Sequence, residues 1–428
     1  MVKTRLKVVL INHSDTQGGA SVVTYRLMNA LCAEGLDARM LVLDKNTDSL
    51  RVDEAANGRW ARMPFYLEHG EIFLRNGFNR STLFKISTGK YGVRLSRHPW
   101  VKDADVVIVN WINQGMMSLK EIGAIAREKP VIWTMHDLWN MTGVCHVNAR
   151  LSSDGSFGTA CENYLYECKD CPLTGRGTLA QAVYRAKRRL YESSNIHFVA
   201  VSNEVARLCR LSPLMSKCDI SVIPNALPVD KFGTAPVLSR RQLGVPEGKH
   251  LVVMGAARLD DPVKNLPLAL KALNQIATPD VAAVFYGDLR QPDVLKSLNL
   301  PHVWLGRIEG HDKLQSLMAH ARVVLSTSVW ETLPGTIVEG IATGGVAVAT
   351  DNGGQSDIID NGVTGYLVDS QTNTGEDLVS AVADAVDRAF MLPCTPEARQ
   401  QRHDVMAHRF GAPAVARSYI ALFKRILS

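Results

Sequence analysis

Short runs of consecutive apolar residues alternate along the chain with longer segments in which apolar residues recur every three or four positions. The runs have the length of strands buried on both faces, and the longer segments have the period of amphipathic helices. In the first half, the strand-like runs are 6–12, 38–43, 105–110, 131–135, 197–201 and 220–224. This alternation predicts an α/β fold with a doubly wound, mainly parallel sheet.

The same alternation restarts after residues 223–232, which have the proline and polar content of an inter-domain linker. The strand-like runs that follow are 250–256, 281–286, 303–305, 323–326 and 346–350. A chain of 428 residues is long enough for two cores. The predicted organisation is a first domain over 1–222, a hinge over 223–232, a second domain over 233–411 and a final helix over 412–428.

One stretch of the second half has the composition of a loop that leads into a helix. Pro334 suits a first helical turn, where its missing N–H costs no hydrogen bond, and Gly335 and Thr336 leave the backbone open. Such a helix start carries a positive partial charge and suits phosphate. Glu331 and Glu339 flank it and can only accept hydrogen bonds, which suits sugar hydroxyls. Taken alone, the two glutamates are more simply explained as a surface charge and a helix charge.

Two cations, Arg258 and Lys264, follow the first strand of the second half. Ligands bind at the carboxyl ends of strands in open α/β sheets, so these cations should meet the two glutamates at one sheet edge. There they could bracket a diphosphate and stabilise it as it leaves. For the pair alone, two ordinary surface cations are the alternative.

The first half offers weaker site signals. Gly18–Gly19, between the first strand and its helix, would let a ligand approach the backbone, although a simple turn explains the pair as well. His136 follows a strand end and is therefore a site candidate. The Gly-x-Gly-x-x-Gly pattern is absent, so a dinucleotide site is not indicated.

Four of the eight cysteines are clustered, at Cys145, Cys161, Cys168 and Cys171. Four soft ligands in a polar loop resemble a structural zinc site, and the closing Cys-x-x-Cys is the more specific half. Two disulfides or four free thiols are the alternatives. A reducing compartment argues against a disulfide framework.

Basic residues gather in two segments. Residues 62–100 interleave seven Arg or Lys with seven aromatic residues. This pattern suits a contact with anionic lipid head groups or with a phosphorylated acceptor, or else a solvated insertion with buried aromatics. Residues 174–195 predict a basic amphipathic helix with a solvated face. The net charge of +6 does not indicate nucleic-acid binding. No run approaches the ~20 apolar residues of a membrane-spanning helix, so we expect a cytoplasmic protein that rests at most peripherally on a membrane.

Several of these residues occur in segments that resemble the retaining glycosyltransferases of family 4, which include bacterial capsule and exopolysaccharide (colanic-acid-like) transferases. The resemblance spans residues 222–368. The matching segments are Val222–Asn225, Gly255-x-x-Arg258 with Lys264–Asn265, Leu305–Gly306, Ser326 to Glu331 with Glu339, Gly340-x-Ala342, and Gly353–Gly354 through Gly365. The first half matches more loosely, through Gly18–Ala20 and His136–Cys145.

The resemblance implies a GT-B fold, in which two doubly wound Rossmann-like domains face each other across a cleft and the C-terminal helix crosses back to the first domain. It implies that Arg258 and Lys264 bind the donor diphosphate, Glu331 the donor sugar and Glu339 the ribose. It implies the following further contacts: backbone donors at Leu333, Pro334, Gly335 and Thr336, a nucleobase pocket at Gly306 and Arg307, a place near the diphosphate for Gly18 and Gly19, and His136 against the reacting sugar. Many relatives carry histidine where this chain has Asn110, so that position is given no role.

These expectations describe a metal-independent, retaining transferase that needs no cofactor for catalysis. It would move a sugar from a nucleoside-diphosphate sugar to a glycan or a polyprenyl-phosphate-linked acceptor in surface-polysaccharide assembly. A nucleotide-sugar epimerase or hydrolase of the same architecture is the first alternative, and a two-domain sugar-binding protein is the second.

Overall fold

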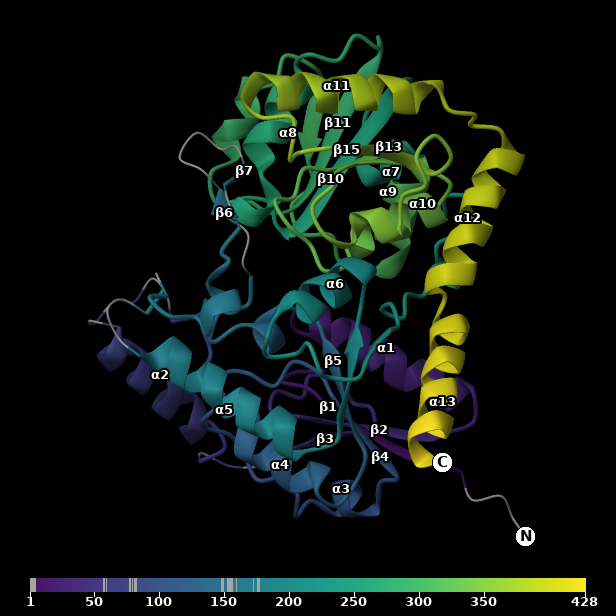
Figure 1. Cartoon of the computed structure of the whole chain (residues 1–428). Coiled ribbons are helices and arrows are strands. Elements are labelled where there is room, and N and C mark those ends of the chain that lie inside the picture. The colour runs from purple at the N-terminus through teal and green to yellow at the C-terminus, as the bar shows by residue number, and fades with distance from the viewer. Residues whose placement is uncertain are drawn as a thin grey trace. The chain divides into compact units, whose positions relative to one another are not determined.

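The chain divides into two compact units in the computed structural model, and each is described by itself (Figure 1). The first unit comprises Met1–Asn148, Cys161–Ala226 and Ala412–Ser428, and the second comprises Ala149–Ala160 and Leu227–Gly411. The structure describes residues 5–56, 58, 60–76, 78, 80, 83–147, 150–151, 157–158, 160–171, 173–174 and 178–428.

A seven-stranded parallel sheet forms the centre of the first unit, in the order β3-β2-β1-β4-β5-β8-β9. Its strands are β1 (Lys7–Ile11), β2 (Asp37–Val42), β3 (Val52–Glu54), β4 (Val106–Val109), β5 (Val131–Met135), β8 (Ile196–Ala200) and β9 (Ile220–Val222). All residues of β4, β5 and β8 are buried, because helices cover both faces of a parallel sheet. The reversal of strand order beside β1 makes the sheet doubly wound, as the sequence predicts.

Seven α-helices of the described residues belong to the first unit. They are α1 (Gly19–Ala33), α2 (Met63–Arg75), α3 (Pro99–Asp103), α4 (Leu119–Ala126), α5 (Leu179–Ser193), α6 (Asn203–Leu211) and α13 (Ala412–Leu427). Helix α13 packs beside α1, and its Tyr419 and Phe423 are buried in the core that α1 forms with β1, β2 and β4. The Tyr419 hydroxyl also forms a 2.9 Å hydrogen bond with the Thr134 hydroxyl on β5. The C-terminal helix therefore completes the first unit, which confirms that part of the predicted fold.

A six-stranded parallel sheet forms the centre of the second unit, in the order β12-β11-β10-β13-β14-β15. Its strands are β10 (His250–Arg258), β11 (Val281–Asp288), β12 (His302–Trp304), β13 (Ala321–Ser326), β14 (Val346–Thr350) and β15 (Gly365–Val368). Its α-helices are α7 (Arg240–Leu243), α8 (Leu266–Leu273), α9 (His311–His320), α10 (Gly335–Ala342), α11 (Gly375–Met391) and α12 (Pro396–Phe410). A short antiparallel pair, β6 (Arg150–Leu151) and β7 (Phe157–Gly158), groups with this unit.

Helices cover both faces of this second sheet. Helices α8 and α11 pack together over one face, in a core of aliphatic side chains from β10, β11, β13 and β14. Helices α9 and α10 lie on the other face. There Gly340 lets α10 approach closely, since a Cβ at that position would lie 2.4 Å from Val324 Cγ2. The predicted α/β architecture of two Rossmann-like units is thus confirmed.

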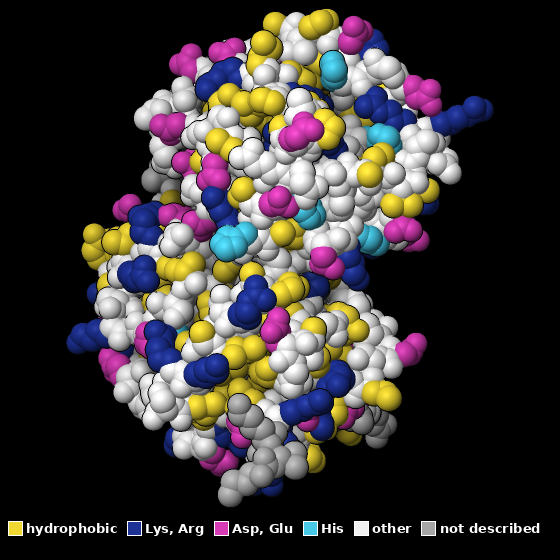
Figure 2. Space-filling model, turned by 90° about the vertical axis from the view of Figure 1, so that its right-hand side faces the viewer, with side chains coloured by type: hydrophobic (Ala, Val, Ile, Leu, Met, Phe, Trp, Pro, Cys, Tyr) yellow, Lys and Arg dark blue, Asp and Glu magenta, His cyan; other side chains and the backbone are white. Residues whose placement is uncertain are grey.

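Short 3-10 helices occupy several of the loops. They are η2 (Trp139–Met141), η3 (Asn163–Tyr166), η4 (Val229–Lys231), η5 (Pro262–Lys264), η6 (Pro292–Ser297) and η7 (Gly354–Asp357). Figure 2 shows one face of the molecule, on which basic and acidic side chains are interspersed. Within the described part of the chain, no helix combines the length and apolar character needed to cross a membrane.

Candidate functional site

The predicted second-unit site centres on an ion pair. Short helix η5 follows β10 and ends at Lys264, whose ammonium is paired with Glu331 Oε1. The Ser328 hydroxyl donates a 2.9 Å hydrogen bond to the same oxygen. Both partners keep some exposure, 28% for the lysine side chain and 19% for the glutamate. The structure thus brings together two residues that lie 67 positions apart in the sequence.

The backbone of Glu331 is held by the predicted glycine pair. Gly354 N donates to Glu331 O at 2.9 Å, and Glu331 N donates to Asn352 O at 3.1 Å. Gly353 has a φ of +118°, and a Cβ there would lie 2.0 Å from Glu331 O. Only glycine fits at this position, which explains why Gly353 matters for holding the carboxylate in place.

Helix α10 begins beside this ion pair, and no side chain caps its N-terminus. Its first residue is Gly335, so Pro334 precedes the helix instead of lying in its first turn as we expected. Boundaries of this kind shift by one residue when the first turn is not fully hydrogen-bonded. The uncapped terminus offers backbone donors and positive partial charge at Gly335 and Thr336, as the anion-site prediction requires.

Glu339 lies one turn further along α10 and is 8% exposed. Its neighbour Tyr286, at the end of β11, escaped the sequence analysis. Burial raises the pKa of the Tyr286 phenol, and the Glu339 carboxylate raises it further. The tyrosine ring lies over Gly255 on β10, where a Cβ would be only 1.9 Å from the ring. A tyrosine immediately before Gly287 was the signal that could have identified this residue.

The other predicted donor-binding side chains have different partners. Arg258 ends β10 and donates from Nε to Asp260 at 3.4 Å. Arg307 donates to Asp288 at 2.7 Å and is largely exposed. Gly306 accepts a 2.7 Å hydrogen bond from Gly287 N, which joins the ends of β11 and β12. The hydrogen bonds found among the described residues therefore link Lys264 to Glu331 and leave the two arginines outside that network.

Three buried polar side chains around this site have at least one polar atom with no hydrogen-bond partner among the described residues. These are both amide atoms of Asn265, both amide atoms of Gln355, and the indole N–H of Trp330. Buried polar groups are normally hydrogen-bonded, because leaving one unsatisfied costs about 1–3 kcal/mol. Their position in the loops that carry Lys264, Glu331 and Gly354 is consistent with partners supplied by water or by a ligand.

In the first unit, Gly18 and Gly19 lead into α1, which also lacks a side-chain cap. Gly18 has a φ of +90°, and a Cβ added to either glycine would meet nothing within 4 Å. The backbone is therefore open to a ligand here. The nearby Asp15 is 1% exposed and accepts hydrogen bonds from Asn46 and Thr47, which hold the loop in place.

His136 follows β5, and its Nε2 lies 3.0 Å from Asn110 Oδ1 at the end of the neighbouring strand β4. Burial lowers the pKa of His136 to about 4, so the imidazole is neutral at physiological pH. The sequence analysis gave Asn110 no role, but the structure shows that it holds this imidazole.

A second hydrogen-bond chain runs from the same strand end. Asp137 Oδ2 accepts from the Trp111 indole at 2.9 Å and lies 2.6 Å from His146 Nδ1. His146 Nε2 lies 3.0 Å from the Ser87 hydroxyl. Donors around Asp137, His146 above all, lower the pKa of its carboxyl although burial opposes them. Sequence reasoning singled out none of these four residues as site residues, because they meet only through the fold.

The cysteine cluster lies partly in the core of the first unit. Cys145, Cys168 and Cys171 are buried and Cys161 is partly exposed. The Gly143 N–H donates to Cys168 Sγ at 3.0 Å. Burial raises the pKa of the Cys145 thiol to about 11 and that of Cys168 to about 12. The described residues contain no set of three or more His, Cys, Asp or Glu arranged to hold a metal ion. Part of the 145–171 loop lies outside the described residues, and the zinc site stays a prediction.

Helix α5 departs from the expectation of a solvated basic face over 174–195. Lys187 is fully buried and donates to the carbonyl oxygens of Trp139, Thr142 and Gly143, the last two at 3.0 and 2.9 Å. Burial lowers the pKa of Lys187 to about 7. The expectation was wrong for this residue because its long stem reaches the core, where the loop that contains Gly143 presents carbonyl groups.

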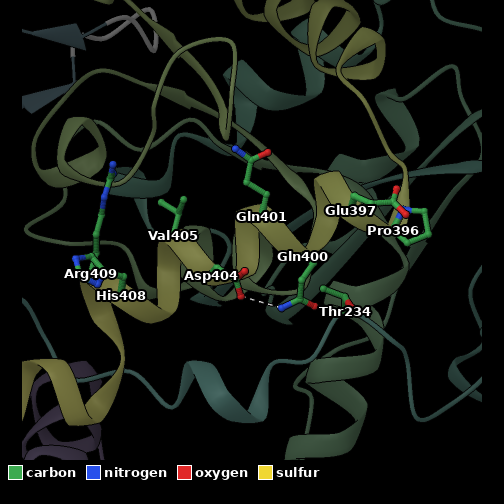
Figure 3. A pocket seen from close by; sticks show the side chains of 9 residues that line it. All are labelled: Thr234, Pro396, Glu397, Gln400, Gln401, Asp404, Val405, His408 and Arg409. Atoms are coloured by element: carbon green, nitrogen blue, oxygen red, sulfur yellow. Dashed lines mark hydrogen bonds between the residues drawn. The ribbon is translucent and has the colours of Figure 1, made fainter.

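A separate hollow of about 900 Å³ lies along α12 (Figure 3). Polar side chains dominate its lining, and Gln400 donates to Asp404 at 2.8 Å within it. The lining includes none of the predicted site residues.

Comparison with known proteins places the sequence match in the second unit. Residues 238–400 match the family described as glycosyl transferases, group 1. The phosphatidyl-myo-inositol mannosyltransferase of Mycobacterium tuberculosis is 27% identical over 197 residues, which cover 45% of this chain and 50% of that protein. The chain spans about two fifths to a half of the length of the curated relatives it matches.

Solved structures match over nearly the whole chain, at identities that show the fold alone. Sucrose-phosphate synthase from Thermosynechococcus elongatus is 16% identical with a TM-score of 0.66, over 99% of both chains. HepE of Anabaena, solved with UDP-glucose, is 16% identical with a TM-score of 0.61, over 98% of this chain and 100% of that one. The matched family is one of transferases, which does not favour the epimerase, hydrolase or sugar-binding alternatives. Residues 238–400 therefore match the group 1 glycosyl transferases, and the chain has the two-sheet GT-B fold of its structural neighbours.

Proposed function

We propose that this protein is a retaining glycosyltransferase of family 4 that uses a nucleoside-diphosphate sugar. The observation that carries the proposal is the Lys264–Glu331 ion pair beside the uncapped start of α10, inside the segment that matches the group 1 glycosyl transferases. Cation, helix terminus and carboxylate supply the binding elements needed for a diphosphate and a sugar. The UDP-glucose complex of HepE supports the same class of donor.

Different residues of the second unit bind different parts of the donor. Lys264, Arg258 and the N–H groups at the start of α10 stabilise the diphosphate as the bond from the sugar C1 to the phosphate oxygen breaks. Glu331 Oε1 is already shared by Lys264 and Ser328, so its Oε2 is the atom that accepts from a donor sugar hydroxyl. Glu339 binds the ribose hydroxyls.

The acceptor hydroxyl attacks C1 on the face from which the diphosphate departs, which retains the configuration, and its proton passes to the leaving phosphate. With two cations and a helix terminus at the diphosphate, the reaction needs no metal. His136, neutral at physiological pH, would act toward the reacting sugar as a hydrogen-bonding group without charge.

The proposed setting is the cytoplasmic assembly of surface polysaccharide, with a glycan or a polyprenyl-phosphate-linked acceptor. The name of the mycobacterial relative, a phosphatidyl-myo-inositol mannosyltransferase, supports a membrane-held acceptor. A structural zinc at the four clustered cysteines stays part of the proposal.

A surface feature supports contact with an anionic membrane through residues 62–100. Helix α2 buries Glu68 and Ile72 on one side. Its other side carries Met63, Tyr66 and Leu67, exposed by 38%, 62% and 48%. The apolar α2 face is defined here as these three residues with Trp60, Leu74, Phe78 and Phe84, which are exposed by 64–66%. Residues 77, 79, 81 and 82 lie outside the described residues.

Basic side chains accompany the apolar α2 face. Arg62 and Lys90 keep 69% and 58% exposure, and Arg80 and Lys85 are exposed as well. Exposed aromatic and aliphatic side chains beside cations are typical of segments that bind in the interface of an anionic membrane.

The site proposal is tested by release of nucleoside diphosphate from a panel of nucleotide sugars, with direct titration of UDP and GDP. We expect Lys264→Ala to weaken binding of the nucleoside diphosphate and to lower turnover by about 100-fold or more, because it removes charge stabilisation of the leaving group. Glu331→Gln should preserve nucleotide binding and lower kcat/KM for the sugar donor. Lys271→Ala, an exposed cation on α8 that pairs with Glu376, is the matched control.

Normal nucleotide binding and turnover in both Lys264→Ala and Glu331→Gln would overturn the site assignment. Free or epimerised sugar as the main product, with acceptor present, would instead favour the hydrolase or epimerase alternative.

A further inference from the structure

Trp111 lies where the chain leaves β4, at the carboxyl edge of the first sheet. Its backbone is fixed from both directions, since Trp111 N donates to Asn12 Oδ1 at 2.9 Å and His13 N donates to Trp111 O at 2.9 Å. Asn12 is itself fully buried and donates to Ser14 O and to Ser21 Oγ. These hydrogen bonds fix the Trp111 backbone, while the indole remains partly exposed.

Protein groups pack closely around this indole. Its N–H donates to Asp137, and the rings of His13 and His146 lie 5.7 and 5.9 Å from it, the first in an edge-on arrangement. With its N–H donated to Asp137, the indole has no further hydrogen bond to offer a ligand and can contact one only through its ring face.

Two carboxylate–imidazole pairs flank that ring. His146 Nδ1 lies 2.6 Å from Asp137, and His13 Nε2 lies 3.4 Å from Asp44. Each of the four side chains keeps between 16% and 29% exposure, so a ligand can reach them. Asp44 is also paired with Arg62 at 3.0 Å. Carboxylate oxygens accept hydrogen bonds from hydroxyl groups, so Asp137 and Asp44 are the groups that can bind sugar hydroxyls here.

We propose that Trp111 is the stacking platform for an uncharged sugar ring of the acceptor, with the Asp137–His146 and Asp44–His13 pairs binding its hydroxyls. The inference rests on the proposed transferase function and adds the acceptor class: the group that docks at this edge is a pyranose. The apolar face of a pyranose packs on an aromatic ring, while its equatorial hydroxyls point outward to polar groups at the rim.

The same hydrogen-bond chain contains a serine, a histidine and an aspartate, which invites a hydrolytic interpretation. Ser87 is only 1% exposed, however, and its backbone carbonyl accepts from the Trp139 indole at 2.9 Å. A nucleophile must reach its substrate, so this serine serves to orient His146 and not to attack. Asp137 and His146 then act as acceptor-binding groups.

The experiment measures binding of simple sugars without any donor. Saturation-transfer NMR is recorded with the methyl glycosides of glucose, galactose, mannose and N-acetylglucosamine, on wild type, Trp111→Ala and Trp111→Phe. We expect at least one glycoside to bind wild type, to bind Trp111→Ala about tenfold or more weakly, and to bind Trp111→Phe nearly normally, because phenylalanine retains a ring face.

Trp100→Ala is the matched control, since Trp100 is also partly exposed but lies on α3 beside Lys7 and Asp37, at the opposite ends of the strands. Asp137→Asn is a second variant, which preserves the shape of the side chain and should weaken glycoside binding. Thermal unfolding of each variant shows whether it folds.

Equal saturation transfer in wild type and folded Trp111→Ala, or no transfer to any glycoside in wild type, would overturn the inference. Turnover of nucleotide sugars is measured separately on the same proteins. If glycosides bind through Trp111 but no donor is turned over, the proposed function fails and the sugar site remains. If donor is turned over and the tryptophan variants bind glycosides normally, only the inference fails.

Discussion

Burial of the His136 imidazole should make the free energy of unfolding of the first unit depend on pH. Among the described residues, the ring of His136 is hydrogen-bonded to the Asn110 amide, and burial lowers its pKa to about 4 because a cation is costly in that environment. Since the unfolded chain would titrate this histidine near pH 6.5, the unfolded state binds the extra proton between pH 6.5 and pH 4 and the folded state does not. Acidification through that window therefore favours unfolding.

We expect the free energy of unfolding to fall faster on acidification in wild type than in His136→Gln, by up to about 1.4 kcal/mol per pH unit between pH 6.5 and pH 4. Urea denaturation at a series of pH values measures this difference. His408→Gln, which removes an exposed histidine on α12, should follow the wild-type slope. Parallel curves for wild type and His136→Gln would show that the buried imidazole does not account for the dependence.

At the scale of one element, helix α10 combines two glycines with opposite constraints. A Cβ at Gly340 would press against Val324, whereas at Gly335 the nearest atom would be Leu227 Cδ2 at 3.7 Å, an ordinary contact. Gly340 serves the packing of the helix on the sheet. Gly335 has no such packing need, so we expect its small size to matter for the access of a ligand to the helix start.

Gly340→Ala should lower the free energy of unfolding by about 1–3 kcal/mol, because an overpacked core must shift. Gly335→Ala should leave stability within about 0.5 kcal/mol of wild type but weaken UDP binding, because its methyl group narrows the approach to the backbone donors. Chemical denaturation and calorimetric titration with UDP separate the two effects. A Gly335→Ala protein that binds UDP as tightly as wild type would argue against a phosphate at this terminus.

Elements were easier to predict than contacts, for a physical reason. Continuous apolar runs such as 131–135 and 346–350 mark buried parallel strands locally, and these two matched the structure residue for residue. The ion pair of Lys264 with Glu331 was foreseeable only as a shared sheet edge. The environments of Lys187 and Trp111 could not be predicted from the sequence. They depend on loop carbonyl groups and on residues from other strands, which no local pattern encodes.

At the scale of the whole molecule, the proposed contact of the apolar α2 face with an anionic membrane can be tested directly. We expect the protein to co-sediment with vesicles of phosphatidylcholine and phosphatidylglycerol more strongly than with phosphatidylcholine alone, and less strongly at high salt. Replacing Tyr66, Leu74 and Phe84 together with serine should weaken binding at least tenfold, because it removes apolar area from the apolar α2 face. Met391→Ser, which alters a residue 85% exposed in the second unit, is the control. Equal co-sedimentation of the triple variant and wild type would place the contact elsewhere.

The discontinuity of the first unit has a consequence for how the protein is made. Tyr419 and Phe423 belong to its core, yet the chain reaches them only after the whole second unit has been synthesised. On the ribosome, the second unit can complete its own core while the first still exposes the side of α1 that α13 will cover. A nascent chain interrupted before α13 would carry a finished second unit attached to an unfinished first unit, whose apolar side on α1 would stay exposed while residues 227–428 are translated.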